Sequence, residues 1–282
     1  MSLRNFPALK ICVGAVLAAT LMARPAAAIT FGEPDSDNRF PNVGAIVAVR
    51  DSSIVGSGIL IHPRVLLTAG HVTADIEFLV ASGIATHDDG RVSFGVDATD
   101  PSTWHEIETV LTHPDYQLYP ESSSQDLGVV ILKEPVELPC ATLPYVGLLD
   151  DLKCTGLLRD QGVPTQLLNV GYGVTLEFPP PEFGHADEAD GLRRFSFSDF
   201  QALQNVWLMC NQNPATGAGG VGYGDSGGPR FWLAPNGELV LVGILSRGSP
   251  ELVGLVQAYR LDIAEAHDFV EFVLDLVDAG LL

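Results

Sequence analysis

The sequence is short of basic residues and of cysteine. Its 282 residues include 15 Lys and Arg against 35 Asp and Glu, for a formal net charge of −20. Such a surface repels phosphate groups and anionic lipid, which argues against nucleic acid as a partner. Four cysteines are too few for a disulfide-dense scaffold, and no Cys/His cluster has the spacing of a zinc site. A hydrophobic content of 46% excludes intrinsic disorder.

No hydrophobic run is long enough to span a bilayer. The uncharged run Ile11–Ala23 is too short, follows the basic residues Arg4 and Lys10, and precedes three alanines that end at Ala28. This is the pattern of a secretory signal peptide, and it fits the flanks better than a short membrane anchor does. We expect residues 1–28 to be removed. The product would start at Ile29, lie outside the membrane, and be secreted or periplasmic.

The cysteines that remain after signal removal set an expectation about disulfide bonding. Cys12 leaves with the signal segment, and export permits one disulfide among the three others. We therefore expect one disulfide and one leftover thiol. Three pairings are possible, and the sequence does not choose among them: Cys140, Cys154 and Cys210.

Short apolar runs separated by Gly, Pro, Asn and Asp dominate the rest of the chain. Many short strands with frequent turns are typical of a β-sandwich or β-barrel. One helix is expected from Ile263 to Val277, where apolar residues recur with a period of 3.6, with Asp262 as its N-cap and Gly280 after its end. Examples of the predicted strands are Val43–Val49, Ile59–Leu67, Leu127–Leu132, Leu167–Gly171, Arg230–Leu233, Leu239–Leu245 and Gly254–Leu261.

Three segments carry the residue types of nucleophilic catalysis. A small-residue turn presents His71, an acid, Asp126, precedes an apolar strand, and a glycine-dense loop surrounds Ser226. A serine hydroxyl becomes a nucleophile when a base takes its proton, and a histidine can take and return that proton near neutral pH. A buried carboxylate fixes the imidazole tautomer. The segments are Leu66–Val72, Gln125–Leu132 and Gly222–Pro229.

In this order the three segments resemble those of the trypsin/chymotrypsin-like serine peptidase family, and the resemblance extends over the mature chain. It implies an all-β fold of two antiparallel six-stranded β-barrels with a C-terminal α-helix. Residues 29–150 would form the N-terminal barrel, and residues 151–282 the C-terminal barrel with the terminal helix. The implied activity is that of a monomeric serine endopeptidase. It would cleave polypeptide substrates through an acyl-enzyme, with no cofactor and no metal.

The resemblance also assigns roles within this site. His71 would be the general base, Asp126 the orienting acid and Ser226 the nucleophile. The backbone N–H groups of Gly224 and Ser226 would form the oxyanion hole, since a glycine-rich loop offers such donors without side-chain interference. Ser246 would support the catalytic aspartate.

A further pair concerns activation. In the family that this chain resembles, the residue before the nucleophile, here Asp225, pairs with a freed N-terminal ammonium, here that of Ile29. A buried carboxylate needs such a partner, and its loss is strongly destabilising. Cleavage after Ala28 would free Ile29 directly. We therefore expect export itself to activate the enzyme, without a separate propeptide.

The resemblance leaves the substrate pocket less defined. Gly220 stands where a trypsin-type enzyme carries its pocket aspartate, so that position does not support cleavage after Lys or Arg. Tyr223 is placed at the pocket rim. Residues 246–248 resemble the strand that pairs with substrate, and there Arg247 replaces a usual aromatic and precedes Gly248.

Two other functions fit parts of the sequence. A binding protein on the same fold is suggested by Arg247 and by two absent disulfides, since Val72 and Gly222 stand where many family members have cysteine. An esterase is suggested because residues 224–228 match a nucleophile elbow. That reading requires the acid and the histidine to follow the serine, and the only later histidine is His267, on the predicted terminal helix.

Overall fold

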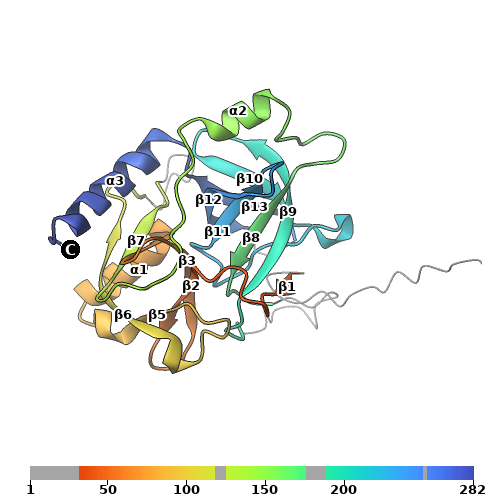
Figure 1. The fold of residues 1–282 in the computed structure, drawn as a ribbon. Coiled ribbons are helices and arrows are strands. Elements are labelled where there is room, and N and C mark those ends of the chain that lie inside the picture. Colours follow the sequence, from red (N-terminus) through yellow and green to blue (C-terminus); the bar gives the residue numbers. More distant parts are fainter. Residues whose placement is uncertain (1–31, 118–124, 176–188, 250–252) are drawn as a thin grey trace, which may run out of the picture.

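The computed structural model describes residues 32–117, 125–175, 189–249 and 253–282. Its strands form two closed antiparallel β-barrels of six strands each, which lie side by side (Figure 1). The predicted all-β fold, with its two barrels and its C-terminal helix, is confirmed. The secretory segment 1–28 and Ile29 lie outside the described residues.

The first barrel is built from six strands of four to nine residues. All five residues of its strand Gly128–Leu132 are buried. The predicted single strand Ile59–Leu67 is wrong, because the chain turns at Pro63-Arg64 and continues as a second strand. Around the barrel the order is β2 (Val43–Ala48), β3 (Ile54–His62), β4 (Val65–Thr68), β7 (Gly128–Leu132), β6 (Trp104–Thr112) and β5 (Gly90–Ser93).

The second barrel closes where its first two strands pair along their whole shared length. A short strand, β1 (Glu33–Pro34), adds to the outside of this barrel by pairing with β9, so the N-terminal segment joins the second barrel rather than the first. Around the barrel the order is β8 (Gln166–Gly171), β9 (Arg194–Leu203), β10 (Trp207–Asn211), β13 (Leu255–Arg260), β12 (Leu239–Gly248) and β11 (Pro229–Leu233).

The C-terminal helix α3 (Ala264–Asp278) follows the second barrel and returns to the first (Figure 1). Its buried face is the predicted apolar stripe, and the Phe269 ring lies 4.9 Å from the ring of His113. The predicted cap is wrong. Ile263 is the N-cap, because the Asp262 carboxylate instead accepts hydrogen bonds from Arg260 and from the N–H of Leu149.

Two further helices were not predicted. They are α1 (Gly70–Ala81), which follows β4, and α2 (Leu148–Cys154), which lies between the barrels in sequence. Single 3-10 turns complete the described structure: η1 (His87–Asp89), η2 (Pro101–Thr103) and η4 (Pro214–Thr216). Within the described ranges, none of these helices has the length and apolar character that a membrane crossing requires.

The expected disulfide is absent. Cys140, Cys154 and Cys210 are all free thiols. Cys210 is fully buried in the core of the second barrel, whereas the other two are exposed. A disulfide bond that includes Cys210 would therefore have to form inside that core.

Candidate active site

His71 is the second residue of α1, directly after β4. The chain leaves β4 through the extended residue Ala69, and the helix begins at Gly70. A Cβ on Gly70 would lie 2.9 Å from the backbone nitrogen of Leu127, so glycine allows α1 to approach the start of β7 closely. This approach brings the backbone of His71 beside the carboxylate of Asp126.

The Asp126 carboxylate is held by several donors. The backbone N–H of His71 donates to its Oδ1 at 2.7 Å, and His71 Nδ1 lies 3.1 Å from Oδ1 and 3.0 Å from Oδ2. The Ser246 hydroxyl, from β12 of the second barrel, donates to Oδ2. Asp126 is 1% exposed, and this burial alone raises its pKa. The hydrogen bonds from His71 and Ser246 outweigh the burial and hold the pKa below its ordinary value of 3.8.

The loop around Ser226 has a shape that only glycine permits at two points. Gly224 and Gly227 have φ values of 93° and 86°. A Cβ on Gly227 would lie 1.9 Å from Thr68 Oγ1 of the first barrel, so the loop and β4 are in close contact. In the described part of the chain, no protein acceptor is bound by the N–H groups of Gly224 and Ser226. Both donors are therefore available to a ligand.

His71 and Ser226 line one cavity of about 300 Å³ at the junction of the two barrels. The predicted residues Tyr223, Arg247 and Gly248 line it as well. Among the described residues, no hydrogen bond joins the Ser226 hydroxyl to the His71 ring. Such bonds are often long before substrate binds. The other lining residues are Val221, Gly222, Leu245, Ser246 and Ser249.

Gly220 is not among the residues that line this cavity. A Cβ on Gly220 would lie 2.3 Å from both Cβ and Oε1 of Gln212, so the side chain of Gln212 fills the space beside it. Gln212 is fully buried, and its Oε1 accepts a hydrogen bond of 2.8 Å from the N–H of Val221. No local sequence pattern marks Gln212, because its contacts join segments separated by the loop 213–219.

Asp225 is fully buried beneath the same loop. Its carboxylate accepts hydrogen bonds from the N–H groups of Gly173 at 2.7 Å and Gly222 at 2.8 Å. A Cβ on Gly171 or Gly173 would lie within 2.5 Å of this carboxylate, so both glycines make room for it. Burial raises the pKa of Asp225 to about 7. This carboxylate therefore carries a large desolvation cost when it is ionised, and the predicted partner Ile29 is outside the described residues.

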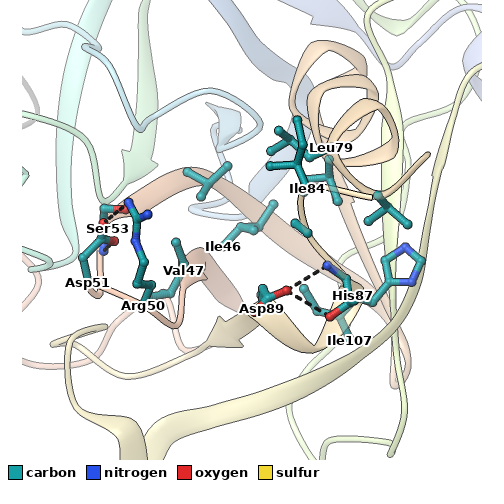
Figure 2. Close-up of a pocket in the computed structure, with 17 residues that line it drawn as sticks. Ile46, Val47, Arg50, Asp51, Ser53, Leu79, Ile84, His87, Asp89 and Ile107 are labelled. Atoms are coloured by element: carbon teal, nitrogen blue, oxygen red, sulfur yellow. Dashed lines mark hydrogen bonds and ion pairs between the residues drawn. The ribbon is translucent and has the colours of Figure 1, made fainter. Parts of the chain in front are cut away.

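Another cavity, of about 350 Å³, lies in the first barrel and contains none of the predicted site residues. Figure 2 shows Ile46, Leu79 and Ile84 near its middle, with Arg50 and Asp51 at one end and His87 at the other. Its lining is mostly apolar. Its hydroxyl groups are paired with carboxylates, as Thr86 is with Asp89, and no hydrogen bond joins its one histidine, His87, to a described hydroxyl, so it is not a second candidate for the same chemistry.

Acidic residues in the segments before and after β5 of the first barrel are engaged in hydrogen bonds. Asp88 bonds Lys133, Asp89 bonds Thr86, and Asp100 accepts from the N–H of Ser102. Within the described ranges, no cluster of three or more His, Cys, Asp or Glu side chains could hold a metal ion.

One comparison with known proteins bears on this site. A family model described as Trypsin matches residues 29–177. The matched segment starts at the predicted mature N-terminus, includes His71 and Asp126, and ends before the loop of Ser226. No curated protein matches the chain.

Proposed function

The chain belongs to the trypsin family, and from this premise we propose that it is an exported serine endopeptidase with the triad His71, Asp126 and Ser226. One observation carries the proposal. The carboxylate of Asp126 binds the Nδ1 side of His71, and the same imidazole lines a cavity with Ser226. This is the order of contacts that a serine nucleophile requires.

The proposed reaction has two steps. Ser226 Oγ attacks the carbonyl carbon of a peptide bond while His71 Nε2 takes the hydroxyl proton. The resulting oxyanion accepts hydrogen bonds from the N–H groups of Gly224 and Ser226. His71 then gives the proton to the leaving amine, and an acyl-enzyme remains. A water molecule then gives a proton to His71 and attacks the ester carbonyl carbon. The bond from this carbon to Ser226 Oγ breaks, His71 returns the proton to Oγ, and the carboxylic acid product leaves.

The end of β12 supports a place for the substrate backbone. Residues Arg247 and Gly248 pair with β13 on one side. On the other side β11 pairs with β12 only as far as Ile244, and within the described residues no strand continues this pairing. An extended peptide can add to such an edge with antiparallel hydrogen bonds, which would lay its scissile bond beside Ser226.

The burial of Asp225 supports the proposed activation by export. Its carboxylate has two backbone donors and no ion pair with a described side chain. The ammonium of Ile29 would supply the missing charge once the signal peptide is cut after Ala28. N-terminal sequencing of the active exported protein tests this step. A start well downstream of Ile29 would contradict it.

The peptidase activity is tested by digestion of a denatured protein mixture. The chain that starts at Ile29 should cleave it, and Ser226→Ala should lower the rate by at least about 10³-fold. Ser82→Ala, which changes an exposed serine at the end of α1, should cleave like the unchanged chain. Cleavage that persists in Ser226→Ala would overturn the proposal. A folded, correctly processed chain without cleavage would instead favour a binding protein on this fold.

A further inference from the structure

We propose that Gln212 forms the base of the substrate side-chain pocket and selects residues whose side chain ends in an oxygen acceptor, a carboxamide or a carboxylate. The proposal rests on the peptidase function above and names its substrate class. Gln212 directly follows β10 and is fully buried, and its backbone N–H donates to the carbonyl oxygen of Gly254 at 2.9 Å. Its side chain therefore starts from a fixed point behind the active-site cavity.

Two glycines, Gly220 and Gly248, lie beside the Gln212 side chain. A Cβ on Gly220 would lie 2.3 Å from Gln212 Cβ and Oε1, and a Cβ on Gly248 would lie 3.4 Å from Gln212 Nε2. Side chains at both positions would thus point at the Gln212 carboxamide. Gly248 lines the cavity that holds Ser226, whereas Gln212 is not among the lining residues. The carboxamide therefore lies directly behind the cavity wall at Gly248, and a substrate side chain reaches it by displacing that wall.

The orientation of the carboxamide is settled by its neighbour. The N–H of Val221 is a donor, and it lies 2.8 Å from the carboxamide, so the atom that faces it must be Oε1. The NH₂ group is consequently on the other side. Gln212 Nε2 is buried and has no hydrogen-bond partner among the described residues. A buried donor without an acceptor is costly, and this donor lies next to the cavity wall at Gly248.

No carboxylate of the described cavity lining competes with a substrate for the Gln212 NH₂ group. Its lining contains Arg247 and no Asp or Glu from the described residues. The Arg247 guanidinium lies 4.9 Å from the centroid of the Trp207 ring and so stays near the cavity. A substrate side chain with a terminal oxygen would satisfy the Gln212 NH₂ group, whereas an apolar side chain of equal length would leave it unpaired. A basic side chain would meet one more donor and no carboxylate from the described lining residues.

The experiment compares peptides that differ only in the residue before the cleaved bond: Gln, Glu, Met and Lys. The unchanged chain should cleave after Gln or Glu with a kcat/KM at least about tenfold above that for Met. The balance between Gln and Glu distinguishes a carboxamide from a carboxylate preference, and either supports the proposal. Ratios of kcat/KM within one protein are unaffected by a reduced folded fraction.

Two variants at position 212 test the donor itself. Gln212→Met keeps the length and removes the NH₂ group, so the ratio of Gln or Glu to Met should fall close to one. Gln212→Glu keeps an oxygen for the Val221 N–H and replaces the donor by an acceptor, so cleavage after Lys should gain at least about tenfold relative to Gln. The matched control Gln201→Met, at an exposed position of β9, should keep the ratios of the unchanged chain.

Three results would overturn the inference. They are equal rates for Gln, Glu and Met in the unchanged chain, an unchanged ratio in Gln212→Met, or no gain for Lys in Gln212→Glu. Labelling of Ser226 by a fluorophosphonate separates these results from failure of the peptidase function. A chain that labels but shows no preference contradicts only the role of Gln212. A folded chain that neither labels nor cleaves contradicts the function and the inference together.

Discussion

The hydroxyl of Ser57, on β3 of the first barrel, donates a hydrogen bond of 2.8 Å to the carbonyl oxygen of Gly224 in the second. The same oxygen, Ser57 Oγ, accepts from the N–H of Tyr172 at 3.1 Å, and the backbone N–H of Ser57 donates to the carbonyl oxygen of Ser226 at 2.7 Å. Ser57 is fully buried. One residue of the first barrel thus fixes both ends of the short segment that would carry the oxyanion donors.

Ser57→Ala should therefore weaken both the fold and the proposed catalysis. The buried N–H of Tyr172 loses its acceptor and Gly224 loses a donor, so the free energy of unfolding should fall by about 1–3 kcal/mol. Denaturant unfolding in a Ser226→Ala background, which prevents self-cleavage, measures this change. Ser82→Ala is the matched control and should leave it unaltered. An unchanged midpoint in Ser57→Ala would contradict this stabilising role of the Ser57 hydroxyl.

Asp126→Asn should leave the fold intact and reduce turnover by about 10⁴-fold. The amide keeps the size of the carboxylate, but it can present its NH₂ group to His71 Nδ1 and favour the wrong imidazole tautomer. Initial rates of peptide hydrolysis measure the effect. Asp160→Asn, at an exposed position, serves as the control. Near-normal turnover in Asp126→Asn would remove this residue from the proposed triad.

The pH dependence of stability should reveal the partner of Asp225. The pKa of this buried carboxyl is raised to about 7 from 3.8, so without a partner charge the folded state binds the extra proton between these values. Stability must then fall as pH rises from about 4 to about 7, by on the order of 4 kcal/mol. The ammonium of Ile29 would lower the pKa and remove most of this fall.

Two versions of the protein distinguish an Asp225 paired with the Ile29 ammonium from an unpaired one. One begins at Ile29, and the other carries Gly-Ser before it, both in the Ser226→Ala background. Chemical denaturation at pH 4.5 and pH 8 should show the larger loss of stability in the extended chain. Asp225→Asn should remove the difference between the two chains. Identical pH profiles for the two starting points would contradict the proposed ion pair.

The cysteines should react in two classes. Cys140 and Cys154 are exposed, so a thiol reagent should modify both in the native protein. Cys210 is buried in the second barrel, where burial raises the pKa of its thiol, so it should react only after unfolding. Mass spectrometry after native and denatured labelling gives the count. Fewer than three reactive thiols in the denatured, unreduced protein would reveal a disulfide.

Several features of the fold were predictable because their signals are local. Apolar runs marked most of the strands, and the period of 3.6 residues marked α3. Helix α1 has no such signal, since Phe78 is 66% exposed and Leu79 is also exposed, and an exposed apolar face hides the period. Asp262 looked like a cap by its position, but the N–H of Leu149, distant in sequence, binds its carboxylate instead.

The residues of the candidate site also differ in whether a local sequence pattern marks them. Small residues before His71 and glycines around Ser226 are local consequences of tight turns, so the sequence pointed to them. Gln212 could not be found in this way, because its place depends on Gly220 and Gly248, which different strands and loops bring to it. The role of Ser57 depends likewise on the contact between the two barrels.

Activation of Ser226 by His71 is measured by covalent labelling. The chain that starts at Ile29 is treated with a fluorophosphonate and mapped by peptide mass spectrometry. The account predicts a single adduct on Ser226, with labelling slowed by at least about 10³-fold in His71→Ala and unchanged in Ser82→Ala. An adduct on another serine, or equally fast labelling of Ser226 in His71→Ala, would contradict it.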